Sequence, residues 1–236
     1  MPEVWESAGE EVLLFMNKDN MKKYLILLLA FLFSSFASAS AQNISAIGQW
    51  VKSSPDEYYS LLARFENGDK DIIKSDLAKL YYGFAFCKEY NGNFDMFSEM
   101  YDALKAGDND KALEEAMKSR KQNPVCLELL YQIASLTFKS PEGVDNAYRV
   151  SAMMKVILDS GDGKSPQSAY KVIRTGDEYK ILSIVYRMDS LLMQTALDGN
   201  IDKMDIATRD GKEVTVYFDR SLPSARDAEI LSGFVK

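Results

Sequence analysis

The spacing of the apolar residues changes near residue 160, and this change limits the folds open to the chain. Before residue 160, apolar residues recur three or four positions apart, as at Ile73, Leu77, Leu80 and Phe84. This period places them on one face of an α-helix. Further segments of the same kind follow after short loops, which predicts antiparallel helical hairpins. We expect helices to begin near residues 55, 73, 94, 111, 125 and 142.

After residue 160, apolar and polar residues alternate, which is the pattern of a half-buried β-strand. Val214, Val216 and Phe218 share one face of such a strand, and Asp210-Gly211 precedes them. An Asp-Gly pair between two alternating runs is typical of a tight hairpin turn. Asp198-Gly199-Asn200 indicates a second turn, so we expect a three-stranded antiparallel meander.

The predicted fold class is therefore α+β, with N-terminal antiparallel helical hairpins and a small C-terminal antiparallel β-meander. Residues 42–160 are expected to form a helical domain and residues 161–236 a mixed, β-containing domain. Residues 170–173 fit a short strand. Residues 177–187 fit either a helix or a strand.

One predicted hairpin resembles a tetratricopeptide repeat. Between Gly107 and Pro124, the small residues Ala112, Ala116 and Ser119 occupy positions where the second helix of that repeat allows close helix packing. Ala147 follows Ala112 at nearly the repeat's period of about 34 residues. The tryptophan and glycine of the repeat's first helix are missing, so a helical bundle that only resembles such repeats fits equally well.

Residues 21–41 have the three parts of a secretory signal peptide. Lys22 and Lys23 form the basic region, residues 24–33 form an apolar run, and small residues follow. Two overlapping Ala-x-Ala patterns fit the cleavage site, and we favour the one that makes Gln42 the first mature residue. An uncleaved anchor is the alternative, but the run is shorter than the ~20 residues that cross a bilayer comfortably.

Residues 1–20 precede the basic region and are acidic, so we expect them to be a non-native N-terminal extension, with Met21 as the true start. The mature chain contains no second apolar run long enough to cross a membrane. We expect a periplasmic or secreted protein.

The composition excludes several functions. Histidine is absent, which removes Ser-His-Asp and Cys-His catalysis and histidine-based zinc and haem sites. The net charge of -7 disfavours binding to nucleic acid, because phosphate contacts need a basic surface. The two cysteines, Cys87 and Cys126, are too few for an all-cysteine metal site, and they could be either a disulfide or two buried thiols. We expect no cofactor and no metal.

Two short motifs invite a functional interpretation. Gly163-Lys164-Ser165 lacks the earlier glycine of a phosphate-binding loop, and the following Pro166 would break the helix that such a loop needs. We interpret it as a structural turn, and a calcium loop fits no better. Asp177, Glu178, Asp202 and Asp205 are candidate carboxylate pairs for glycoside hydrolysis.

Those four acids have polar, turn-rich surroundings, so we expect them to be solvated and to titrate as ordinary surface groups. The tyrosine- and phenylalanine-rich stretch from Tyr81 to Phe86 is expected to be core. No residue is therefore assigned a catalytic, cofactor-binding or metal-binding role.

Several segments together resemble a known family. They are residues 58–65 (YYSLLARF), 80–84 (LYYGF), 161–166 (GDGKSP), 177–179 (DEY) and 216–219 (VYFD). Their order resembles an exported Bacteroidetes family described as domain of unknown function 4919. The resemblance spans nearly the whole mature chain. It implies an α+β architecture and a non-cytoplasmic location, and it implies no activity and no functional residue.

We expect a non-catalytic module that binds another envelope or secreted protein through its helical part. The alternatives are a carboxylate-dependent hydrolase acting on glycan or cell-wall material and a structural accessory of the envelope. With no histidine, such a hydrolase would need carboxyl groups with shifted pKa values.

Overall fold

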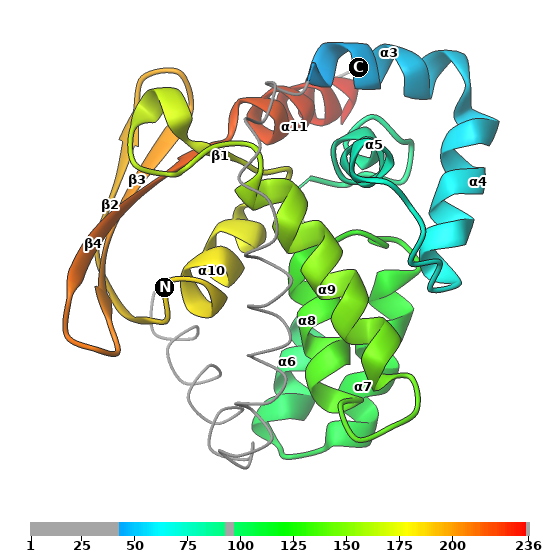
Figure 1. Cartoon of the computed structure of the whole chain (residues 1–236), viewed down its shortest axis with the longest axis horizontal. Helices are drawn as coiled ribbons and strands as arrows, with labels where there is room; N and C mark the ends of the chain where they lie inside the picture. The colour runs from blue at the N-terminus through cyan, green and yellow to red at the C-terminus, as the bar shows by residue number, and fades with distance from the viewer. Residues whose placement is uncertain (1–42, 93–96, 235–236) are drawn as a thin grey trace.

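The computed structural model describes residues 43–92 and 97–234, which form nine α-helices and one four-stranded mixed sheet. The α+β prediction is confirmed. The helices lie on one side of the molecule and the sheet on the other (Figure 1). The helices are α3 (Ile44–Ser53), α4 (Pro55–Glu66), α5 (Lys74–Phe84), α6 (Ser98–Lys105), α7 (Asn109–Arg120), α8 (Leu127–Leu136), α9 (Gly143–Leu158), α10 (Thr175–Ile184) and α11 (Ser221–Phe234).

The helix boundaries follow local signals where the sequence carries them. Helix α4 begins at Pro55, with two acids in its first turn, where they favour the positive end of the helix dipole. Helix α7 begins after Asp108, whose side chain accepts a hydrogen bond from the backbone N–H of Lys111 at 3.0 Å. Helices α3 and α11 lie outside the predicted set. Residues 177–187, which fitted either structure, belong largely to helix α10.

The sheet consists of β1 (Tyr170–Lys171), β2 (Met188–Leu197), β3 (Ile201–Thr208) and β4 (Glu213–Asp219), in the order β1-β4-β3-β2. Strands β2, β3 and β4 form the predicted antiparallel meander, and the turns contain Gly199 and Gly211 with positive φ. Strand β1 pairs in parallel with β4, which makes the sheet mixed rather than purely antiparallel. The pairing of β3 with β4 confirms the predicted hairpin across Asp210-Gly211.

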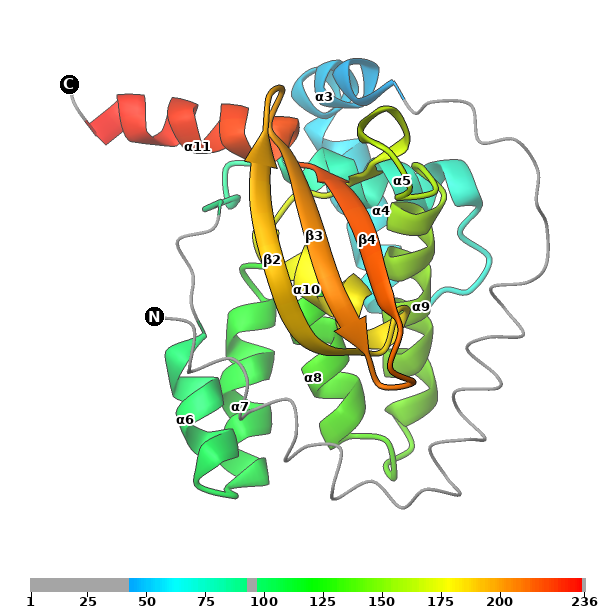
Figure 2. The ribbon, with the colours of Figure 1, turned by 90° about the vertical axis from the view of Figure 1, so that its left-hand side faces the viewer.

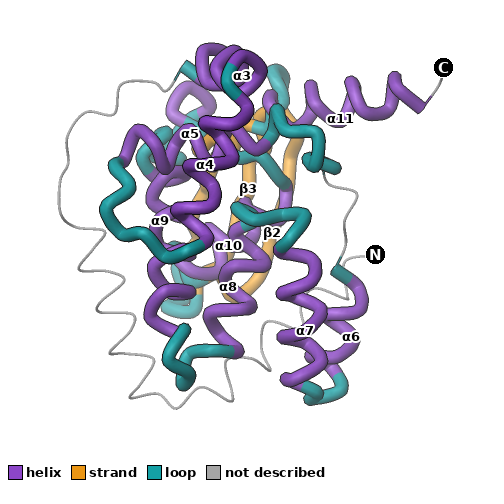
Figure 3. The backbone as a smooth tube through the Cα atoms, turned by 90° about the vertical axis from the view of Figure 1, so that its right-hand side faces the viewer, coloured by secondary structure: helices purple, strands orange, loops and turns teal. Residues whose placement is uncertain are grey.

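Helix α10 lies under the sheet, between it and the other helices. It contacts both β2 and α8. Figure 2 shows α10 behind the three long strands, whose outer face is turned to the viewer, and Figure 3 shows the helices from the opposite side with the strands behind them. The inner face of the sheet supplies Met204 and Ile206 of β3 and Val216 and Phe218 of β4, all fully buried. The alternation in β4 predicted Val216 and Phe218 on this face, whereas Val214, the third residue of that prediction, is only partly buried.

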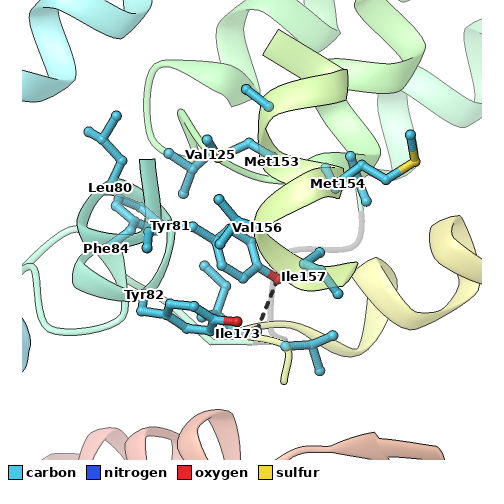
Figure 4. Packing of buried hydrophobic residues seen from close by; sticks show 14 of the residues in the cluster. Leu80, Tyr81, Tyr82, Phe84, Val125, Met153, Met154, Val156, Ile157 and Ile173 are labelled. Carbon is cyan, nitrogen blue, oxygen red and sulfur yellow. Dashed lines mark hydrogen bonds between the residues drawn. The ribbon is translucent and has the colours of Figure 1, made fainter. Parts of the chain in front are cut away.

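One hydrophobic cluster runs from the helices to the inner face of the sheet. Figure 4 shows its centre, where side chains of α5 meet those of α9. Tyr81, Tyr82 and Phe84 are buried, which confirms their interpretation as core, whereas Phe86 is only partly buried. Because this cluster contains residues from both sides of position 160, the division into two domains stays a prediction.

A second, smaller cluster joins α6, α7 and α8. Ala116 lies in it, and Ala112 on the same helix is also fully buried. Cys126 belongs to this cluster, while Cys87 belongs to the main one, and both are free thiols in the structure. Burial raises the pKa of Cys87 to about 11 and that of Cys126 to about 12.

The predicted signal peptide and the predicted extension both fall outside the described residues. Among the residues that the structure describes, no helix is both long and apolar enough to span a bilayer.

The loop containing Gly163-Lys164-Ser165 is a structural turn that holds the sheet. The Asp162 carboxylate accepts hydrogen bonds from the N–H of Lys164 and the hydroxyl of Ser168, and the carbonyl of Gly163 accepts one from Tyr217 N–H in β4 at 2.9 Å. Gly163 has φ +66°, and a Cβ added there would lie 2.3 Å from the ring of Tyr170. Glycine is therefore needed at this position for both its backbone and its lack of a side chain.

We expect Gly163→Ala to destabilise the protein by about 1–3 kcal/mol more than Gly211→Ala. Both glycines have positive φ, so the backbone cost is similar, but a Cβ at Gly211 meets no atom of the described residues within 4 Å. The difference in free energy of unfolding between the two variants, measured by urea denaturation, isolates the clash with Tyr170. Equal losses of stability would show that Tyr170 can move aside.

Candidate functional site

Three of the four candidate acids are buried, so the expectation that all four are solvated was wrong. Asp177 and Glu178 lie in the first turn of α10 and are 0% exposed, and Asp202 on β3 is 1% exposed. Their polar, turn-rich flanks do not predict this, because the burial comes from segments elsewhere in the chain. Asp177 bonds to residues of α5 and α8, and Glu178 lies near Asp202 and Arg220. Asp205 is the exception.

Asp205 points to the other face of β3, three residues along the strand from Asp202. Its carboxylate lies 2.7 Å from Nζ of Lys203 and accepts a hydrogen bond from the hydroxyl of Thr215. Both contacts favour the charged form, so the pKa of Asp205 lies below its ordinary value. The structure therefore places Asp205 apart from the other three acids, as a half-buried group in an ion pair with Lys203.

Asp177 connects α10 to two other helices. Its carboxylate accepts a hydrogen bond from the hydroxyl of Tyr81 at 2.6 Å and another from the N–H of Leu127, the first residue of α8, at 3.1 Å. A carboxylate at this place satisfies a backbone donor at the helix N-terminus and complements the helix dipole. Tyr81 in turn accepts a hydrogen bond from Ile173 N–H, drawn in Figure 4.

The pKa of Asp177 is raised to about 7. Burial is the main cause, and the hydrogen bond from Tyr81, the charge of Arg174 and the N–H of Leu127 oppose it. Arg174 is itself buried and donates hydrogen bonds to the side chains of Asn91 and Asn123. These contacts make Asp177 a structural acid that links helices.

Glu178 and Asp202 form a second cluster together with Arg220, which precedes α11. Arg220 Nε lies 3.0 Å from a carboxylate oxygen of Asp202 and 3.8 Å from one of Glu178. Asp202 also accepts a hydrogen bond from the Gln194 side chain of β2, and Gln194 accepts one from the hydroxyl of Tyr179. We call Glu178, Asp202 and Arg220 the acid–arginine cluster.

Glu178 is the least satisfied member of the acid–arginine cluster. Both of its carboxylate oxygens are buried, and neither has a hydrogen-bond partner among the residues that the structure describes. Burial raises the pKa of Glu178 well above its ordinary value, the charge of Asp202 adds to this effect, and Arg220 opposes it. Two acids with different environments are the arrangement that acid–base catalysis uses. Here, however, both acids face the packed interior.

Neither of two surface hollows reaches these acids. One hollow, of about 480 Å³, lies near the starts of α3 and α11 and includes Phe86 and Lys171. The other, of about 360 Å³, lies along α4 and includes Asp56 and Arg64. Within the described residues, no group of three or more acids or cysteines is placed to hold a metal ion.

The surface offers one feature that suits a macromolecular partner. Strand β2 lies at the margin of the sheet (Figure 2), and three consecutive large apolar residues on it are exposed. Leu191 is 37% exposed, Leu192 is 50% exposed and Met193 is 58% exposed. We call these three residues the β2 apolar edge.

The chain matches a known protein family. Residues 45–227 match the family described as a domain of unknown function, DUF4919. The chain belongs to this family. The match confirms the family indicated by the sequence resemblance. Comparison of the chain with curated proteins and with solved structures gives no match.

Sequence reasoning missed two parts of this DUF4919 domain. Arg220 is a single basic residue after a strand, and no sequence pattern links it to Glu178. The β2 apolar edge did carry a signal, since Leu191, Leu192 and Met193 interrupt the apolar–polar alternation expected of a half-buried strand.

We expect Glu178→Gln to stabilise the DUF4919 domain at neutral pH. The pKa of Glu178 is higher in the folded chain than its ordinary value of 4.5, so the folded chain keeps this proton at pH values where the unfolded chain has lost it. The stabilising contribution of the protonated carboxyl group is therefore full below pH 4.5 and is lost as the pH rises. Glutamine keeps the size and carries no proton to lose. The stability advantage of the variant should therefore grow above pH 4.5, by at most about 1.4 kcal/mol per pH unit.

Urea denaturation of both proteins between pH 4 and pH 9 measures this advantage. Glu213→Gln, at an exposed position on β4, is the control and should leave the pH dependence unchanged. Parallel stability curves for wild type and Glu178→Gln would show that Glu178 titrates as an ordinary surface acid.

Proposed function

We propose that this DUF4919 protein is an exported, non-catalytic module that binds another protein. The observation that carries the proposal is the β2 apolar edge. Large apolar side chains on an exposed edge strand are unfavourable in water, and natural edge strands usually carry charged residues or proline there. A partner that covers Leu191, Leu192 and Met193 would remove this cost.

The mode of binding in this proposal is the addition of a partner strand to β2. An extended segment can form backbone hydrogen bonds with the free side of an edge strand, while its side chains contact those of the edge. Strand β2 is 10 residues long, which gives such a segment a full-length partner. The opposite margin of the sheet, β1, has only 2 residues.

The helical hairpins would act as the support of this surface. Their tetratricopeptide-like character is part of the proposal, and the full burial of Ala112 and Ala116 supports it, because small buried residues allow close helix packing. Helix α10 then transmits this support to the sheet through its contacts with α8 and β2.

The location is also part of the proposal. The basic, apolar and small-residue parts of residues 21–41 support export to the periplasm or the cell exterior, from a cell of the Bacteroidetes type. A partner would then be another envelope or secreted protein.

Hydrolysis of glycan or cell-wall material is the second candidate, and the acid–arginine cluster favours it. The raised pKa of Glu178 beside Asp202 fits a general acid. Their exposures of 0% and 1% weigh against it, since a glycan must reach both groups. Turnover of cell-wall glycan by the wild type that Glu178→Gln abolishes would favour the hydrolase over the binding module.

For export, we expect the mature protein to begin at Gln42. Expression of the chain from Met21 in a Gram-negative host should yield a periplasmic or secreted product. Intact-mass spectrometry should show the mass of residues 42–236. A product that keeps residues 21–41 would contradict cleavage and favour a membrane anchor.

For binding, we expect Leu192→Lys to abolish capture of the partner. A lysine on an edge strand opposes the addition of another strand, because pairing would bury its charge. Tagged residues 42–236 serve as bait for the envelope fraction of the source cells, and captured proteins are quantified by mass spectrometry. Ile73→Lys is the matched control, since Ile73 is 62% exposed and lies before α5, away from β2. Equal capture by both variants would contradict the proposed surface.

A further inference from the structure

The free edge of β2 is suited to a particular partner. In the described part of the chain, the strand order β1-β4-β3-β2 leaves one side of β2 without a neighbouring strand. From Leu191 to Gln194 every residue is exposed. The backbone groups on this side therefore remain available for pairing with another strand.

Strand β2 contains two bulges near these exposed residues. The register with β3 shifts between Met188 and Ser190 and again between Leu191 and Met193, so Leu192 has no partner residue on β3. A bulge can protect an edge by twisting it away from other chains. Here the residue in the second bulge is a half-exposed leucine instead of a charged residue.

The charges on β2 favour a partner that is itself uncharged along its length. The chain as a whole is 27% charged, yet Ser190–Leu197 contains no charged residue. A strongly acidic or basic peptide would find no opposite charge there. A second copy of β2 has the required neutral, apolar sequence by construction.

The ends of β2 favour the antiparallel orientation for such a copy. Arg187 and Asp189 lie at the start of the strand and Asp198 follows its end, and all three are exposed. In the antiparallel register that pairs Arg187 with Asp198 of the other copy, Asp189 lies opposite the uncharged Ala196. Antiparallel pairing brings the Arg187 end of each copy to the Asp198 end of the other. Parallel pairing would instead place equal charges beside each other, which is destabilising.

We propose that β2 pairs antiparallel with β2 of a second copy of this chain, forming a two-fold dimer with one continuous sheet. This inference rests on the proposed function, because it names the partner of the same edge. The contact is isologous, so each copy buries its β2 apolar edge against that of the other copy. Neither copy then keeps an exposed β2 edge.

Sedimentation velocity on residues 42–236 tests the dimer directly. We expect twice the monomer mass for the wild type, and the monomer mass for Leu192→Lys and for Met193→Lys. Ile73→Lys adds the same charge at an exposed apolar residue elsewhere and should remain dimeric. Circular dichroism and thermal melting must show that each variant is folded. If one of the two edge variants does not fold, the other still tests the dimer.

Cross-linking locates the two-fold axis. Under mild oxidation, Met193→Cys should form a disulfide with its own copy, because residues near the axis face each other. Ile73→Cys should not, and the native cysteines are buried. A monomeric wild type at hundreds of micromolar, or a dimer that survives Leu192→Lys and fails to cross-link through position 193, would overturn the inference.

These results also separate the inference from the proposed function. If the wild type is a monomer while Leu192→Lys still loses an envelope partner that Ile73→Lys keeps, the second-copy inference falls and the proposed function stands. If neither a dimer nor such a partner depends on Leu192, both fall.

Discussion

The Asp177 carboxylate holds together segments that are far apart in the sequence. It accepts one hydrogen bond from Tyr81 on α5 and one from the first N–H of α8, and these residues are 96 and 50 positions away. Because Asp177 lies in the first turn of α10, these two bonds fix the start of that helix against the helical layer. The sheet then packs on α10. The position of the sheet, and with it the free edge of β2, depends on this buried acid.

Burying the carboxyl groups of Asp177 and Glu178 has a cost in free energy of folding, and the contacts of the two acids offset this cost only partly. Asp177 receives two hydrogen bonds and lies near an arginine. Glu178 has Arg220 at 3.8 Å and, within the described part of the chain, no hydrogen bond. Burying a carboxylate without partners is costly, and the usual response is to keep its proton. The neighbouring acids thus have different roles. Asp177 links helices, whereas Glu178 lies beside Asp202 and Arg220, where burial raises its pKa well above the ordinary value.

The sequence predicted the elements with strong local signals. Pro55, Asp108 and the Asp210-Gly211 turn mark their boundaries through backbone conformation and capping, which depend on a few neighbouring residues. It did not predict the parallel pairing of β1 with β4, because that contact joins residues 48 positions apart with no local pattern. The burial of Asp177 and Glu178 was missed for the same reason. The residues that meet Asp177 lie on α5 and α8, and those that meet Glu178 lie on β3 and just before α11, all far from the two acids in the sequence.

Three tyrosines in and just after α5 have a consequence for the order in which the chain folds. The hydroxyls of Tyr82 and Tyr90 donate to backbone carbonyls of Lys171 and Ile173, and that of Tyr81 donates to Asp177. During synthesis, these tyrosines leave the ribosome more than eighty residues before their acceptors do. The surface of the early helices that is buried in the finished fold therefore emerges before its hydrogen-bond acceptors exist. Until then the tyrosine hydroxyls must bond to water, so tight packing of these helices has to wait until the segment around residue 173 has been synthesised.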